Sequence, residues 1–241
     1  MLAPKPLLFA ACLTLLHLTA CSQGPPARDF VSAEINPKTA SVEFFLWDAK
    51  GEPYGSLGEL KDALGRDGYT LRFAMNGGMF DARQRPVGLY IEKGQQLSPV
   101  DTVQEAYGNF YLQPNGIFYL TQDKKAYVVP TTEFVPHPDI HYATQSGPML
   151  LIDGEYHPAF REESESLNIR NGVGILPNGN VLFAISKVPV NFYTFASFFK
   201  YHGCENALYL DGSISKAYAP AQDWEQLDGT LGVLIGVVDP K

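Results

Sequence analysis

The stretch NFYTFASFFKYHGCENALYLDGSIS, residues 191–215, predicts a helix, a strand and a polar turn in direct succession. Its phenylalanines recur at helical spacing, which predicts a helix over 192–202 with one buried face. Asn191 is placed to cap the start of this helix, and Gly203 to end it. These aromatic side chains are therefore expected in the core rather than in a cofactor site.

The run Ala207–Leu210 follows this helix and predicts a buried strand with Asp211 at its carboxyl end. Other short β-branched and aromatic runs are bounded by Gly, Pro or Asn and predict further strands. These are Val42–Trp47, Tyr69–Met75, Leu89–Glu92, Phe110–Leu112, Ile117–Leu120, Met149–Ile152, Val173–Leu176 and Leu231–Val238.

Three dipeptides have the composition of hairpin turns: Asn115-Gly116, Asp153-Gly154 and Asn178-Gly179. A second helix is expected over Leu57–Leu64, because Ser56 and Glu59 form a capping box and Gly65 offers a left-handed stop. The sequence thus predicts an α/β (α+β) fold: a single domain with a mixed β-sheet core, flanking helices and an active cleft formed by Gly-rich loops at strand ends. We expect a monomer.

The first twenty residues have the pattern of an export signal. Lys5 supplies a positive start, and the apolar stretch Leu7–Leu18 is too short to span a bilayer. Leu18-Thr19-Ala20-Cys21 is typical of the site where a lipoprotein is cleaved and its cysteine acylated. We therefore expect lipidation at Cys21, and a location in the cell envelope at the periplasmic face of the outer membrane.

This pattern divides the chain into a signal peptide (1–20), a lipidated N-terminus and tether (21–40) and one domain (41–241). Cleavage would leave Cys204 as the only cysteine besides Cys21, so no intramolecular disulfide is expected. The mature chain would carry 26 acidic against 17 basic side chains, which argues against nucleic-acid binding and favours a small or glycan substrate.

Four polar, Gly-rich turns follow predicted strands, where rigid scaffolds present reactive groups. Their glycines let the backbone approach a ligand, and their polar side chains can bind or react. The catalytic candidates are Asn76, Arg170 and Asp211; the candidates for substrate binding are Gly77, Gly78, Gln145, Ser146, Gly147, Asn171, Gly212, Ser213 and Ser215.

Arg170 and Asp211 are the most informative of these candidates. Arg170 lies in apolar sequence, so its guanidinium should either meet a carboxylate, with Asp211 as the resting partner, or bind an anionic ligand. Asp211 would act as base, nucleophile or metal ligand, or it is an ordinary turn residue before glycine. The histidines lack metal-ligand spacing, and no metal or cofactor is expected.

Six blocks in this order resemble those of the bacterial phosphodiester glycosidase family, which is similar to the catalytic domain of the lysosomal uncovering enzyme, N-acetylglucosamine-1-phosphodiester alpha-N-acetylglucosaminidase. They are NGGMF, PVGLYIEKG, TQSGPMLLIDG, NIRNGVGILPNG, VLFAISKVPVNFYTFA and NALYLDGSISKAYAP. The resemblance covers about Phe44 to Val238 and implies hydrolysis of a sugar-1-phosphodiester on the glycosidic side. The matching positions are Asn76, Gly77, Ser146, Gly147, Arg170, Asp211 and Ser215. Ser213 replaces a glycine of the family pattern.

These residues lead to a mechanism in which Arg170 and backbone N–H groups hold the phosphate and Asp211 acts at the sugar carbon. A second carboxylate is sought among Asp81, Glu162, Glu163 and Glu165. The alternative is an envelope lipoprotein that binds a glycan or a partner protein through the same loops without catalysis. A metal-dependent phosphodiesterase is disfavoured because no His and Asp cluster is present in the sequence pattern.

Overall fold

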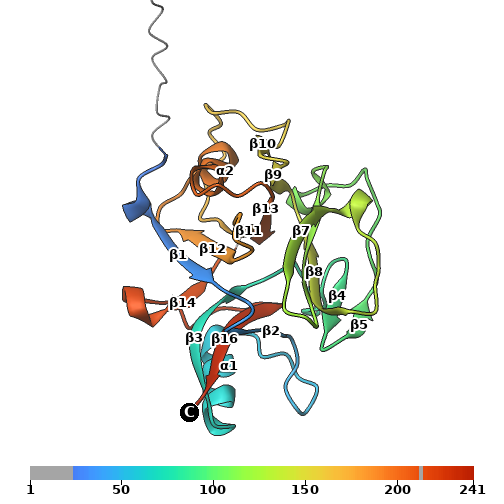
Figure 1. Ribbon diagram of the computed structural model, residues 1–241, viewed down its shortest axis with the longest axis vertical. Coiled ribbons are helices and arrows are strands. Elements are labelled where there is room, and N and C mark those ends of the chain that lie inside the picture. Colours follow the sequence, from blue (N-terminus) through green and yellow to red (C-terminus); the bar gives the residue numbers. More distant parts are fainter. Residues whose placement is uncertain (1–23, 212–213) are drawn as a thin grey trace, which may run out of the picture.

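The protein consists of three antiparallel β-sheets that share a hydrophobic core (Figure 1). The structure is a computed structural model that describes residues 24–211 and 214–241. Two α-helices flank the sheets, α1 (Leu57–Arg66) and α2 (Phe192–Tyr201). The α+β prediction is confirmed. Every described strand pair is antiparallel, so the core sheets are not mixed in strand direction.

The first sheet has six strands in the order β1-β12-β11-β13-β9-β10. Their bounds are β1 Phe30–Ile35, β12 Val181–Ser186, β11 Asn171–Ile175, β13 Ala207–Asp211, β9 Met149–Ile152 and β10 Glu155–Tyr156. A register irregularity between Asn171 and Gly172 lets Asn171 lie opposite Asp211. This places two of the predicted site residues side by side.

The second and third sheets have five strands each. The second runs β15-β14-β3-β16-β2, with β15 Trp224–Glu225, β14 Ala217–Ala219, β3 Tyr69–Asn76, β16 Leu234–Pro240 and β2 Ser41–Phe45. The third runs β5-β4-β8-β6-β7, with β5 Gln95–Ser98, β4 Tyr90–Glu92, β8 Ile140–Ser146, β6 Gly116–Thr121 and β7 Ala126–Pro130. Short 3-10 helices occupy Ala27–Asp29, Asn109–Tyr111, Thr131–Glu133 and Pro220–Gln222.

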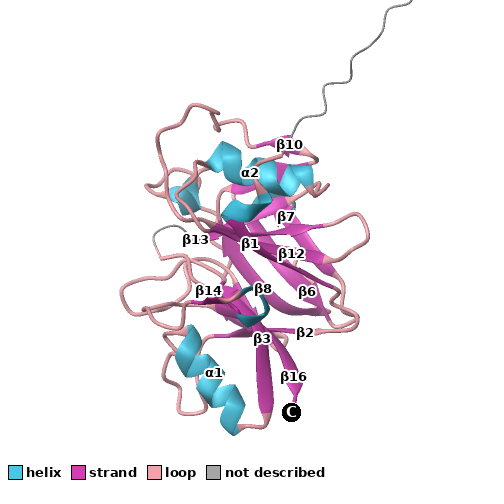
Figure 2. Ribbon diagram, turned by 90° about the vertical axis from the view of Figure 1, so that its left-hand side faces the viewer, coloured by secondary structure: helices cyan, strands magenta, loops and turns pink. Residues whose placement is uncertain are grey.

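One hydrophobic core receives side chains from all three sheets. Phe183 of β12 packs against Phe73 of β3 and Phe118 of β6, with ring centroids 5.6 and 5.9 Å apart. Figure 2 shows the two helices at opposite ends of the molecule. Each covers a smaller cluster, and Cys204 lies buried in the cluster beneath α2. Apolar side chains that alternate along the strands therefore pack the three sheets around one hydrophobic core.

Both helices begin as predicted. Ser56 Oγ accepts a hydrogen bond from the backbone N–H of Glu59 at 3.1 Å, and Asn191 Oδ1 accepts one from Thr194 at 2.8 Å. Gly203 has a φ of +84°, the left-handed conformation expected after a helix. The predicted stop at Gly65 was wrong: α1 continues to Arg66, and Gly68 takes the positive φ.

Two further local predictions were wrong. Phe110–Leu112 was expected as a strand, but Asn109–Tyr111 forms a 3-10 helix. Asn115-Gly116 was expected to close a hairpin, but Gly116 is the first residue of β6, where a Cβ would lie 2.3 Å from Met149 Sδ. Its glycine is thus required by packing and not by a turn.

The other two hairpin predictions are confirmed. Asp153 and Gly154 both have positive φ and join β9 to β10. The loop with Gly179 at positive φ joins β11 to β12.

The folded part of the chain begins before residue 41. Phe30–Ile35 forms β1, which pairs with β12 over six residues, and Phe30 stacks on Phe198 of α2 at 4.4 Å. The segment assigned to a tether over 21–40 therefore includes a strand of the first sheet. Cys21 lies outside the described residues, in which no helix is long and apolar enough to cross a membrane.

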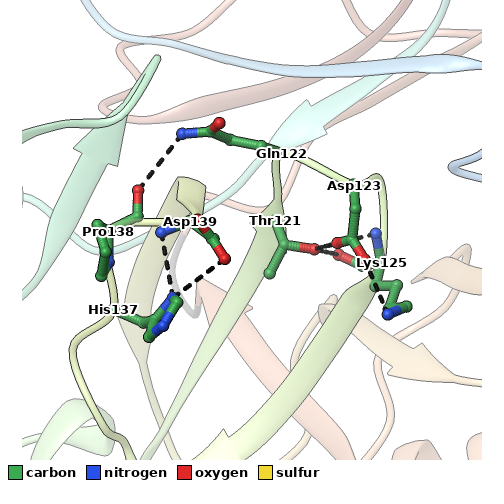
Figure 3. Close-up of polar contacts among 7 residues, drawn as sticks. All are labelled: Thr121, Gln122, Asp123, Lys125, His137, Pro138 and Asp139. Atoms are coloured by element: carbon green, nitrogen blue, oxygen red, sulfur yellow. Dashed lines mark hydrogen bonds and ion pairs between the residues drawn. The ribbon is translucent and has the colours of Figure 1, made fainter.

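The far end of the third sheet carries an exposed polar cluster (Figure 3). Thr121, Asp123 and Lys125 bond to one another at the end of the β6–β7 hairpin, with Lys125 Nζ 2.8 Å from Asp123 Oδ2. His137 and Asp139 lie just before β8 begins, with Nδ1 and Oδ2 3.4 Å apart. These charges are at the opposite end of β8 from Ser146, so they do not belong to the candidate site.

Two glycines test this packing in opposite directions. We expect Gly65→Ala to raise the free energy of unfolding by about 0.5–1 kcal/mol, because alanine favours a helix interior and only Lys241 Nζ lies near its Cβ, at 3.8 Å. Gly172→Ala should lower it by about 1–3 kcal/mol, because its Cβ would lie 2.8 Å from the Leu208 carbonyl oxygen. Urea unfolding measures the free energy of unfolding of both variants. Equal changes in the two variants would contradict the open surroundings described for Gly65 and the close packing described for Gly172.

Candidate functional site

The candidate site lies where strands of all three sheets end. Asn76 is the last residue of β3, Ser146 the last of β8 and Asp211 the last of β13, while Asn171 is the first of β11. Asn76, Ser146 and Asn171 are fully buried, and Asp211 is 6 % exposed. Polar residues at four strand ends are therefore brought together, as the sequence predicts.

Asn171 is the centre of a hydrogen-bond network between the first and second sheets. Its Nδ2 donates to Asn76 O at 2.7 Å and to Asn76 Oδ1 at 3.0 Å. Its Oδ1 accepts from the Asp211 backbone N–H at 3.0 Å and from Ser215 Oγ at 3.3 Å. The amide expected to bind substrate is fully engaged within the protein, so its evident role is to hold the other residues in place.

Asn76 completes this network. Its Nδ2 donates to Asp211 Oδ2 at 2.7 Å, and its Oδ1 also accepts from the backbone N–H of Lys216 at 2.9 Å. Ser215 Oγ bonds to Asp211 O at 2.9 Å. A hydrogen bond to a carboxylate from a fixed amide restricts its rotation. Asn76 is thus placed to orient the carboxylate of Asp211.

Two hydrogen bonds attach the third sheet to this network. Ser146 Oγ donates to Leu210 O at 2.7 Å, next to Asp211. Thr144 Oγ1 donates to Gly77 O at 3.0 Å, next to Asn76. Both donors come from the same face of β8, so one strand fixes the turn after β3 and the end of β13 together.

The glycines predicted to contact a ligand are required by close packing at this junction. A Cβ on Gly77 would lie 2.4 Å from Ile235 Cγ1, and one on Gly78 would lie 2.6 Å from Thr144 Oγ1. A Cβ on Gly147 would lie 2.8 Å from the Phe110 carbonyl oxygen. Contact with a substrate stays a prediction for these residues, and Gly212 and Ser213 lie outside the described residues.

Arg170 is 1 % exposed. The sequence predicts Asp211 as its partner, but the two side chains do not form an ion pair. Its Nε donates to Val190 O at 2.8 Å, its Nη2 to Ser166 O at 2.8 Å and its Nη1 to the Tyr209 hydroxyl at 3.3 Å. None of the seven ion pairs in the described part of the chain involves Arg170. Burial lowers the pKa of Arg170, as expected for a cation removed from water.

Aromatic rings enclose this guanidinium. Its Cζ lies 3.6 Å from the ring centroid of Phe192 and 5.4 Å from that of Tyr209. Phe192 stacks in turn on Phe160 at 4.9 Å, and Phe160 on His157 at 4.8 Å. Cation–π contacts and neutral acceptors therefore stabilise a charge that no described carboxylate neutralises.

Tyr209 connects the two charged candidates electrostatically. Burial raises the pKa of Tyr209 to about 12, the charge of Arg170 acts to lower it and the charge of Asp211 acts to raise it. Its hydroxyl thus stays protonated at neutral pH, within electrostatic reach of both. Arg170 and Asp211 are not hydrogen-bonded to each other, but the charges of both act on the Tyr209 hydroxyl.

Gln145 does not join this network. Its Oε1 accepts from the backbone N–H groups of Leu89 and Asp101 at 3.0 and 2.9 Å, and its Nε2 donates to Asp101 O at 2.7 Å. Period-two alternation along β8 turns it away from the face of Thr144 and Ser146. It holds the start of the loop 99–108 against the end of β8.

The structure distinguishes between the four candidates for a second catalytic carboxylate. Asp81 pairs with Arg85, whose Nη2 lies 2.6 Å from Oδ2, and hydrogen bonds from Arg85 lower the pKa of Asp81 to about 2. It cannot be the protonated acid at neutral pH. Glu162, Glu163 and Glu165 lie on the loop whose Ser166 carbonyl accepts from Arg170, so they stay candidates.

The larger hollows of the described surface lie elsewhere. One of about 650 Å³ is lined by Glu43, Lys93 and His141, and one of about 600 Å³ by Lys38, Tyr127 and other residues around the β6–β7 hairpin. An active cleft at the network stays a prediction. Asp211 and Ser215, which are 6 % and 7 % exposed, are the least buried members of the network. The described residues contain no group of three His, Cys, Asp or Glu that could hold a metal.

Three contributors were missed by the sequence reasoning. Thr144 shares its strand face with Ser146, and Tyr209 precedes Asp211 by two residues, so period-two alternation could have indicated both. Phe192 was assigned to the core, but its ring also covers Arg170. Its position at the first turn of α2 carried no separate signal.

A carboxylate at a strand end, held by buried amides in an α+β domain, is a group that glycosidase-type sites use. The chain belongs to the phosphodiester glycosidase family, whose sequence model matches residues 69–231.

Relatives and solved structures agree with this membership. The chain is 39 % identical over 212 residues to the uncharacterized protein YigE of Escherichia coli K12, covering 86 % of this chain and 82 % of that protein. Its fold is similar to the zebrafish N-acetylglucosamine-1-phosphodiester alpha-N-acetylglucosaminidase catalytic domain, with a TM-score of 0.58 and 15 % identity over 90 % of this chain and 84 % of the other. A hypothetical protein from Synechocystis gives a TM-score of 0.51 at 14 % identity, over 87 % and 59 % of the two chains.

The network predicts that Asn171 is a major source of stability at the junction. We expect Asn171→Ala to lower the free energy of unfolding by about 2–4 kcal/mol, because it leaves several buried polar groups without partners. Asn178→Ala, at an exposed hydrogen bond to Glu34, is the matched control and should cost less than about 0.5 kcal/mol. Equal urea midpoints for the two variants would contradict the role assigned to Asn171.

Proposed function

We propose that this protein is an envelope lipoprotein that hydrolyses the glycosidic bond of a sugar-1-phosphodiester. Family membership supports a glycosidase-type function, and the solved zebrafish relative is described by its name as acting on an N-acetylglucosamine-1-phosphodiester. The cleavage pattern at Cys21 supports lipid anchoring. No cofactor enters the proposed reaction.

The observation that carries this proposal is the charge of Arg170. A guanidinium removed from water is expected to meet a carboxylate or to bind an anionic ligand, and the structure excludes the first arrangement for the described residues. Three of its five N–H groups are used, and the proposal assigns the other two to a phosphate oxygen. This requires the substrate to reach a guanidinium that is 1 % exposed. Its position supports an anionic leaving group on this side of the site.

Asp211 supplies the opposite charge. The transition state of glycoside cleavage is cationic at the sugar carbon, and a nearby carboxylate stabilises it as base or as nucleophile. Asn76 holds the Asp211 carboxylate through Oδ2, and Asn171 holds its backbone through N–H. In the proposed reaction the sugar carbon faces Asp211 and the departing phosphate faces Arg170. The phosphate is a weak base, so its departure requires less protonation than that of an ordinary alcohol.

The first test combines a charge-removing variant with isotope labelling. Asp211→Asn should lower kcat by on the order of a thousandfold without loss of thermal stability, because the amide keeps the shape and can still accept from Asn76. Asp239→Asn, at an exposed ion pair with Arg72, is the matched control. The parent protein is incubated with a panel of sugar-1-phosphodiesters in ¹⁸O-labelled water.

Mass spectrometry then identifies the bond that breaks. Glycosidic cleavage places ¹⁸O on the sugar, whereas cleavage of the P–O bond places it on phosphate. Label on phosphate, or near-parent turnover by Asp211→Asn, would contradict the proposed chemistry. Absence of turnover across the panel would favour the non-catalytic glycan-binding or partner-binding alternative.

The second test concerns Arg170. We expect Arg170→Met to raise KM for the phosphodiester by about tenfold to a hundredfold, because a charge-assisted hydrogen bond is lost. Stability should change little, since loss of three bonds to neutral acceptors is offset by removal of an uncompensated buried charge. KM for an uncharged aryl glycoside of the same sugar is the control. An equal rise for both substrates with a fall in stability would make Arg170 a purely structural residue.

A further inference from the structure

The first described residues of the chain pack on the outer face of α2. Gly24 lies so close to Tyr201 that a Cβ on the glycine would be 2.3 Å from the ring Cγ. Figures 1 and 2 both show the chain entering at the end of the molecule that carries α2, with the C-terminus at the opposite end. The route of the chain into the domain is therefore fixed by a contact with this helix.

The distance from this contact to the proposed anchor is short. Only Ser22 and Gln23 lie between Cys21 and Gly24, and the three residue steps from Cys21 to Gly24 span at most about 11 Å when fully extended. Acyl chains attached to Cys21 would lie within the bilayer. Gly24, which contacts Tyr201, must then lie within about 11 Å of Cys21 at the bilayer, whatever path Ser22 and Gln23 take.

The surface at this position has a composition that suits a membrane interface. A hollow of about 590 Å³ lies between residues 24–26 and α2, and three tyrosines line it: Tyr156, Tyr193 and Tyr201. Tyr201 is 64 % exposed, and the rings of Tyr156 and Tyr193 stack with centroids 4.5 Å apart. Tyrosine rings with an apolar body and a polar end are enriched at headgroup level.

The charged groups of this surface are compatible with that position. Lys200 Nζ lies 4.6 Å from the Tyr156 ring centroid and 3.5 Å from Glu155 Oε2, so the two charges partly offset each other. Glu162 also lines the hollow. A lysine with a long apolar stem can keep its ammonium among the headgroups. The surface has no strong net charge that would repel a bilayer.

We propose that the outer face of α2, with Tyr193, Lys200 and Tyr201, is the face that the protein holds against the lipid bilayer. The inference rests on the anchor at Cys21 proposed above, and it is independent of the hydrolytic activity. The membrane-facing end is then opposite α1 and the C-terminus, which point away from the lipid.

Thiol labelling of the full, processed lipoprotein in vesicles tests this orientation. Cysteine is introduced on the α2 face as Tyr201→Cys and, in a second variant that keeps the Gly24 contact, as Lys200→Cys. The matched control is Asp62→Cys on the exposed side of α1. Burial raises the pKa of Cys204 to about 12, so its thiol should not react. The probe is a polymer-linked maleimide too bulky to enter the headgroup layer.

We expect both α2 variants to react about tenfold more slowly than Asp62→Cys in vesicles of neutral phospholipid, because the bilayer covers their thiols. Insertion of a long Gly/Ser linker between Gln23 and Gly24 should remove this difference. Equal rates for all three variants in protein that floats with the vesicles would overturn the proposed face. Protein that does not float would overturn the anchor and the face together, while leaving the hydrolysis test unaffected.

Discussion

The amide of Asn171 is the constraint on which the rest of the structure depends. It bonds to Asn76 at the end of the second sheet and to the backbone N–H of Asp211 in the first. Ser146 adds the third sheet through Leu210. A buried polar network is stabilising only when each member is satisfied, so three sheets must end at one place for this one to form. The geometry of the site and the arrangement of the sheets are therefore the same feature.

Arg170 shows how a fold can bury a charge without an ion pair. An ion pair with a resident carboxylate would neutralise the guanidinium and compete with an anionic substrate. Here the stabilising groups are two carbonyls, one phenol and the faces of two rings, none of which carries a charge. These groups stabilise the buried cation without neutralising its charge. The charges of Arg170 and Asp211 both act on the pKa of Tyr209, in opposite directions.

Local sequence signals predicted much of the fold. Asn191 and Ser56 start their helices because side-chain caps act within three residues. Signals failed where distant packing decides: Gly116 and Gly65 look like turn glycines, but one is required by Met149 and the other lies inside a helix. The membership of Asn76 and Asp211 in one site could be predicted from motifs. The contact between the Arg170 guanidinium and the Phe192 ring could not be predicted, because it depends on how α2 packs on the first sheet.

Cys204 has a consequence for how the chain matures. Its thiol is buried beneath α2, and Gly174 provides the space it occupies, since a Cβ there would lie 2.7 Å from Sγ. A thiol with a pKa of about 12 is almost never a thiolate, the form that attacks disulfides. Once folded, the domain should be inert to thiol–disulfide exchange in an oxidising compartment. If the chain is exported as proposed, a Cys204 thiol that is buried before it is oxidised forms no cross-links.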